Sequence, residues 1–402
     1  MRQVRWASWM VGLATALAVC GVRPAAADIR SDQAAAILEW PSVLFSVDLI
    51  MALTGADVLD TVIQISNTSD TAVSVHCFYE NANSHCTNTG EVCVFAQECC
   101  DLETGCGVCL PGWNETDFHL RLTPFQPLGW LASQGESGFD PIPNPPKEFG
   151  TFPIDGVTNV GPDGSSNAGS RIPPVPEQPF NGSLRCIAVD EDGIPVDRNV
   201  LKGEETLEVV GEGMRETEDF DFVTVAKSNA IGIQAREGLV NDDNILVLGG
   251  PDAEYNGCPN FLILNHFFDF AINPAAELGP VDSGEIFTFL TLVPCTQDFL
   301  RQIPGTAVVQ FLVYNEFEQR FSTSRTVLCK AVLPLSLIDT TQPERSIFSA
   351  GLAGTLTGQT RINPIGSGLL AVATEIHDGF GIAEFNVHYQ GDRDQPDLIT
   401  LP

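Results

Sequence analysis

The sequence predicts an all-β protein made of β-sandwich domains that carry a small disulfide-rich insert. Short runs rich in β-branched and aromatic residues recur along the chain, separated by turns rich in Asp, Asn and Gly. Long stretches with the apolar periodicity of a helix are not found among them, and only 28–40 is ambiguous between helix and strand. Six of the twelve cysteines lie within the 24 residues from Cys86 to Cys109. Regularly spaced strands favour sandwiches, and clustered cysteines favour a covalently closed insert.

The N-terminus has the pattern of an export signal. Arg2 and Arg5 precede an apolar run over 9–22, and small residues follow up to Ala27. This order predicts a signal peptide over 1–27 that is cleaved near Ala27. A lipoprotein signal with Cys20 as the lipidated residue is the alternative, although a valine directly precedes that cysteine. We therefore expect a secreted protein or a protein of the bacterial cell envelope.

The charge balance limits the partners of this chain. It has 52 acidic and 20 basic residues, a formal net charge of −32. Residues 1–27 contain three arginines and no acid, so the mature chain is near −35. Such a surface excludes nucleic acid and an anionic membrane surface as partners. It is typical of a protein that stays soluble outside the cell, and it also suits divalent cations.

The first sandwich is expected over 28–135. Its clearest element is a hairpin over 60–80, where apolar and polar residues alternate on both sides of the turn sequence SNTSD. The predicted buried face holds Ile63, Ile65, Val73, Val75 and Cys77. The hairpin resembles those of bacterial immunoglobulin-like sandwich modules, which implies a fold and no activity. We expect sandwiches of immunoglobulin-like or jelly-roll type.

A loop or linker over 136–182 follows, since it holds 10 prolines and 7 glycines in 47 residues. A second sandwich region is expected over 183–402, where strand patterns return at short intervals. These patterns lie at 183–189, 205–211, 221–227, 230–236, 244–250, 260–268, 285–293, 306–315, 325–335, 368–377 and 381–389.

The insert, 84–112, decorates a connection within the first sandwich. Because so short a segment cannot bury a sufficient core, covalent closure is expected to replace one. In an oxidising compartment its cysteines should form disulfides, and six cysteines allow 15 pairings. A zinc site made of four thiolates is the competing interpretation. The six disulfide candidates are Cys86, Cys93, Cys99, Cys100, Cys106 and Cys109.

The order of these cysteines, with an adjacent pair in the middle, resembles the inhibitor cystine knot, or knottin, spacing. The resemblance covers only 86–109 and implies the pairs Cys86–Cys100, Cys93–Cys106 and Cys99–Cys109. It also implies a second functional hypothesis, in which the insert is a protein-interaction or inhibitor head. A stapled surface protrusion between two strands is the simpler interpretation.

Five other cysteines follow the signal segment: Cys77, Cys186, Cys258, Cys295 and Cys329. The odd number predicts two bridges and one buried free thiol. Cys258 with Cys295 is the first choice for a bridge, because both end apolar runs in the same half of the chain.

Motifs that carry catalytic chemistry are sparse. The sequence has no HExxH, no Walker A loop, and no five-residue nucleophile elbow around Ser367. The six histidines are scattered and are expected to be structural. Calcium is the best small-ligand candidate, because Asp190, Asp192 and Asp197 surround a glycine turn in a fragment of an EF-type pattern. Ordinary hairpin chemistry explains the same residues without a metal, and no other cofactor is predicted.

Glycan binding would need exposed aromatic rings, and Trp113 and Trp130, which flank the insert, are the candidates. The sequence as a whole favours a binding or structural function over catalysis, with a protein or glycan at the cell surface as the partner. A secreted glycoside hydrolase that works through a carboxylate pair is the third hypothesis, since acidic residues occur along the whole chain.

Overall fold

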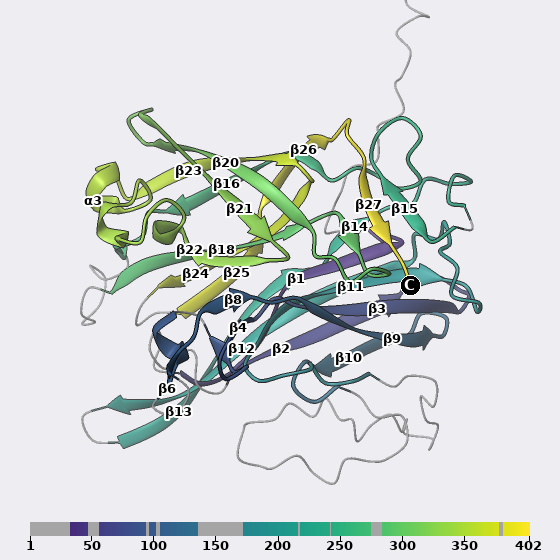
Figure 1. Ribbon diagram of the computed structural model, residues 1–402, viewed down its shortest axis with the longest axis horizontal. Helices are drawn as coiled ribbons and strands as arrows, with labels where there is room; N and C mark the ends of the chain where they lie inside the picture. Colours follow the sequence, from purple (N-terminus) through teal and green to yellow (C-terminus); the bar gives the residue numbers. More distant parts are fainter. Residues whose placement is uncertain are drawn as a thin grey trace, which may run out of the picture.

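The computed structural model describes residues 33–46, 56–93, 96–101, 105–135, 172–215, 218–241, 243–274, 284–377 and 381–402 (Figure 1). Antiparallel sheets dominate this part of the chain, which confirms the predicted all-β, sandwich-type fold. The expected export signal, 1–27, and most of the proline- and glycine-rich segment, 136–171, lie outside the described residues.

The first sandwich is built from two antiparallel sheets. The A sheet has the order β14 (Ile231–Ile233), β1 (Ile37–Phe45), β11 (Phe180–Val189), β3 (Val73–Asn81) and β9 (Asn114–Leu122). The B sheet has the order β10 (Pro127–Leu131), β2 (Ala56–Asn67), β12 (Leu201–Arg215) and β13 (Glu218–Asn229). Strand β1 packs on β2 and β12, so one face of each sheet is buried against the other.

Aromatic side chains fill the space between the A and B sheets. Trp40 and Trp130 are fully buried there, and each indole finds an acceptor. Trp130 Nε1 donates to the Tyr79 hydroxyl at 2.7 Å, and Trp40 Nε1 donates to the Glu204 carbonyl at 3.0 Å. Gly203 lies against the Trp40 ring, where a Cβ atom would come within 2.3 Å of that ring. The core therefore fixes the spacing of the two sheets through two large side chains, Trp40 and Trp130, whose N–H groups both have acceptors.

The strand pairing divides the chain into sandwiches at a different place from the division that its composition predicted. Strand β11 pairs with both β1 and β3, and β12 pairs with β2. Residues 180–233 thus complete the first sandwich, whereas the expected division assigned 183 onward to a second region. The first sandwich needs these strands because β1 and β3 are not neighbours: β11 supplies the hydrogen bonds between them.

The second sandwich also has two sheets. The C sheet has the order β21 (Arg320–Leu328), β20 (Thr306–Asn315), β23 (Thr357–Gly366), β16 (Pro259–Phe267) and β26 (His388–Asp392). The D sheet has the order β17 (Ala271–Ile272), β18 (Glu285–Pro294), β24 (Leu369–His377) and β25 (Gly381–Asn386), and β22 (Ala331–Pro334) pairs with β18. A small sheet of β15 (Ile245–Leu248), β27 (Asp397–Thr400) and β19 (Gln297–Asp298) lies beside them.

The short helices of the second sandwich lie in one segment of the described chain. They are η3 (Leu335–Leu337), η4 (Pro343–Arg345) and α3 (Ala350–Ala353). Asp269 anchors this segment, since its carboxylate accepts from the Thr288 and Ser336 amides at 2.9 and 2.8 Å. The pKa of Asp269 is raised to about 6, because burial outweighs these hydrogen bonds.

The two sandwiches stack through strand β24, which is buried on both faces. Leu370 and Val372 belong to the core of the first sandwich, and Leu369 and Ala371 belong to that of the second. Strand β1 contacts β18 and β24, so the D sheet lies between the A and C sheets (Figure 1). A strand covered on both sides should be continuously apolar, as the LLAVA segment is.

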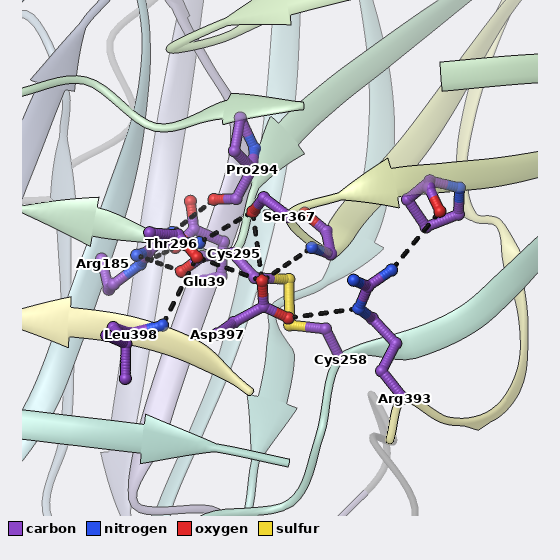
Figure 2. Close-up of a disulfide and its surroundings, with 12 residues drawn as sticks. Glu39, Arg185, Cys258, Pro294, Cys295, Thr296, Ser367, Arg393, Asp397 and Leu398 are labelled. Carbon is purple, nitrogen blue, oxygen red and sulfur yellow. Dashed lines mark hydrogen bonds and ion pairs between the residues drawn. A yellow bond between two sulfur atoms is a disulfide. The ribbon is translucent and has the colours of Figure 1, made fainter. Parts of the chain in front are cut away.

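Polar groups join the sandwiches beside the Cys258–Cys295 disulfide (Figure 2). The Arg185 guanidinium on β11 contacts the Glu39 carboxylate at 2.6 Å and donates to the Pro294 and Cys295 carbonyls at 3.3 Å. This single side chain, 1% exposed, thus connects the A sheet to the end of β18 in the D sheet.

Candidate functional site: the cystine-rich insert and the buried charged junction

The cystine-rich insert extends the β3–β9 pair beyond the edge of the sandwich. Strand β4 (Ser84–Cys86) continues β3 and pairs with β8 (Cys109–Pro111) and with β5 (Val92–Cys93). A 3-10 turn, η1 (Ala96–Cys99), and a hairpin of β6 (Cys100–Asp101) and β7 (Gly105–Cys106) complete it. The insert is therefore a disulfide-closed extension between the two strands β3 and β9, in agreement with the simpler interpretation of the sequence.

Its three bridges are Cys86–Cys99, Cys93–Cys109 and Cys100–Cys106. They correct the pairs that the cystine-knot resemblance implied. Cys100 and Cys106 are opposite each other in the β6–β7 hairpin, so they close a local ring. The preceding Cys99 ends a turn that is buried against Cys86 and Cys93, and the adjacent cysteines therefore point to different partners. These bridges use the thiols that the zinc interpretation needed.

Hydrogen bonds to the Glu177 carboxylate hold the base of the insert. Glu177 Oε1 accepts from the side-chain amides of Asn81 and Asn83 at 2.6 Å, and its Oε2 lies 3.1 Å from His85 Nε2. Burial acts to raise the pKa of Glu177, but the hydrogen bonds outweigh it and the pKa is lowered. The carboxylate stays ionised and ties residues 81–85 to the segment that precedes β11.

Two apolar side chains point outward from the insert. Val108 and Leu110 are 55% and 51% exposed, on either side of the half-buried Cys109. Alternation along the strand explains this, because Cys109 points inward to Cys93 while its neighbours point to solvent. The disulfides hold the backbone that presents them, so a partner would find this pair already ordered.

The tryptophans that were candidates for glycan binding do not form an exposed platform. Trp130 is fully buried in the first sandwich and hydrogen-bonded to Tyr79. Trp113 is half-buried and packs against the same core at the base of the insert. Both rings are used for packing.

Of the three acidic residues predicted to bind calcium, Asp190 and Asp197 accept backbone hydrogen bonds, and Asp192 contributes its backbone amide. One Asp190 oxygen accepts from the amides of Asp192 and Ile194, both at 2.9 Å, around a Gly193 with φ of 86°. Asp197 Oδ2 accepts from the Gly238 amide at 2.8 Å. The arrangement is that of an Asx-type turn, and calcium binding there stays a prediction.

The structure also shows how the five remaining cysteines are used. Cys77 and Cys186 are directly opposite each other on β3 and β11 and form a bridge. Cys258 and Cys295 are joined, the pair that the ends of the apolar runs indicated. Cys329 is left as a buried free thiol. Burial raises its pKa well above the usual value, so it stays protonated and unreactive.

Buried charges line the junction between the sandwiches. Glu205 on β12 and Glu384 on β25 both lie near the hydroxyl of Ser228 on β13. This hydroxyl is 2.8 Å from the Glu205 carboxyl and 3.3 Å from the Glu384 carboxyl. Burial raises the pKa of Glu384 to about 7 and that of Glu205 well above its usual value. Nearby, the Lys330 ammonium donates to the Gly182 carbonyl, and burial lowers its pKa to about 7. A hydroxyl donates only one proton, so one carboxyl must be protonated to satisfy both contacts.

This carboxyl pair cannot meet a polysaccharide, because Glu205 is fully buried and Glu384 is 6% exposed. The sequence did carry a signal for the junction. Charged residues interrupt otherwise apolar strands at Glu39 in ILEW and Arg185 in SLRCIAV. A charge at such a position must find a buried partner, although the pattern does not name it.

No protein-family model matches the chain, and no curated protein matches it either. The five disulfides indicate an extracellular or secreted protein. Within the described residues, helices long and apolar enough to cross a membrane are not found.

Proposed function

We propose that this chain is an exported, acidic β-sandwich protein of the bacterial envelope or extracellular space that acts by binding, with the insert as its interaction head. The observation that carries this proposal is the outward pair Val108 and Leu110 on a segment closed by three disulfides. Exposed apolar side chains on a rigid frame are typical of protein contacts, because little conformational entropy is lost on binding.

The chemistry of the insert favours a protein partner over a glycan. The two tryptophans that could have stacked on a sugar are used in packing, whereas the outward side chains are aliphatic. The N-terminal pattern and the bridges both fit the exported protein that we propose. N-terminal sequencing of the mature protein should begin at Asp28.

A binding screen tests the proposed function. The oxidised mature chain and a Val108→Ser/Leu110→Ser variant would be applied to arrays of envelope proteins and of glycans. We expect protein hits that the variant loses and that the matched control Ile365→Ser keeps, since Ile365 is also 55% exposed but lies on the C sheet. Equal binding by both variants would remove the insert from the interaction. Hits confined to glycans, or turnover of a polysaccharide, would contradict the proposal itself.

A further inference from the structure

A second cluster of polar side chains lies on the face of the A sheet that is turned away from the B sheet. His76 on β3 is directly opposite His119 on β9, and Asp117 is two residues before His119 on the same face. Forty-one residues separate His76 from Asp117 in sequence, yet Nε2 of the first lies 3.1 Å from Oδ2 of the second. The two imidazole rings stack with their centroids 3.9 Å apart.

These three side chains bring their ligand atoms within 4.8 Å of one another. The other two such groups in the described part of the chain each contain cysteines that are already in disulfides. We propose that His76, Asp117 and His119 form a binding site for a divalent transition-metal ion, with Zn²⁺ as the ion that the donor set fits. Two imidazole nitrogens and one carboxylate oxygen match Zn²⁺ and exclude the all-oxygen chemistry of Ca²⁺.

The surroundings of the cluster fit this assignment. His76 is 7% exposed and its ring packs on Phe78, which in turn stacks on Phe299 at 4.1 Å. One ligand is therefore fixed by the core, whereas His119 and Asp117 are exposed and can turn toward a shared ion.

The geometry also leaves room for a further ligand. Strand β9 is at the edge of the A sheet, so the exposed side of the cluster faces solvent. Three protein ligands around Zn²⁺ leave the fourth tetrahedral position to water or to another molecule. Sequence reasoning missed this site, because D-x-H on one strand becomes a three-ligand set only when β3 supplies His76 from 41 residues away.

The test uses the oxidised mature chain after dialysis against a chelator. Titration with ZnCl₂ in a calorimeter should show one site per chain, and Co²⁺ should give the visible absorption of a four-coordinate ion. His119→Ala and Asp117→Asn should each weaken Zn²⁺ binding by about 10-fold or more. Both side chains are exposed, so the variants are expected to keep the thermal unfolding midpoint of the metal-free protein.

His377→Ala is the matched control. Its Nε2 also contacts a carboxylate, that of Glu375 at 2.5 Å, but the described residues do not add a third ligand there. Zn²⁺ affinity should be unchanged in this variant. The proposal is wrong if the wild-type chain binds no Zn²⁺ at micromolar concentrations. It is equally wrong if His119→Ala binds as tightly as wild type, or if His377→Ala loses as much affinity as His119→Ala.

Discussion

The Cys77–Cys186 bridge offers the sharpest test of the first sandwich. It joins β3 to β11 at directly opposed positions and closes a loop with a sequence separation of 109. Replacing both cysteines with alanine removes this constraint from the unfolded chain. The loop-entropy relation for that separation gives a loss of about 4.8 kcal/mol in the free energy of unfolding. The same relation gives about 3.8 kcal/mol for Cys258–Cys295, which has a separation of 37.

The measurement is equilibrium unfolding in guanidinium chloride under oxidising conditions, followed by tryptophan fluorescence. Both cysteines are fully buried, so part of any loss comes from the sulfur atoms rather than from the cross-link. Cys329→Ala gives that part for one sulfur, because it removes a single buried sulfur that forms no bridge, and the double variant removes two. We expect about 1 kcal/mol from this control. A Cys77→Ala/Cys186→Ala variant that is no less stable than Cys329→Ala would refute a stabilising cross-link between β3 and β11.

The buried charges of the junction give three further predictions. Burial raises the pKa of Glu384 from 4.5 to about 7, so between these values the folded protein holds a proton that the unfolded chain has lost. The contribution of Glu384 to the free energy of unfolding should therefore be fully present below pH 4.5 and fall by about 3 kcal/mol as the pH rises toward 7, as measured by denaturant titration at several pH values. Glu384→Gln should flatten this dependence of the unfolding free energy on pH, because the amide does not titrate in this range. An unchanged dependence on pH would show that other groups cause it. Arg185→Met should lower the free energy of unfolding by about 3–5 kcal/mol at pH 7 in the same measurement, since it leaves Glu39 and Glu80 buried without their cation. A loss below about 1 kcal/mol would contradict this role of Arg185 in joining the sandwiches.

Local patterns in the sequence determined the fold class. Alternation of apolar and polar residues sets which face of a strand is buried, and it depends only on neighbours along the chain. The two strands predicted at 60–80 are present as β2 and β3, but the predicted hairpin is wrong, because β2 pairs with β10 and β12 in the B sheet and β3 pairs with β9 and β11 in the A sheet. The turn between them therefore connects the two sheets, which alternation along the chain does not reveal. The number and positions of the cysteines likewise predicted disulfides in the insert, the Cys258–Cys295 bridge and one free thiol.

Only the tertiary structure decided which strands meet and which side chains converge. Strand β11 pairs with β3 from about 100 residues away, because hydrogen bonds between strands do not depend on distance along the chain. The insert's bridges depend on turn geometry that spacing does not encode, so one of 15 pairings could not be chosen. The Glu39–Arg185 contact and the His76–Asp117–His119 cluster arise in the same way. Sequence fixes the residue types that an interior or a metal needs, and the packing of distant strands fixes which of them become neighbours.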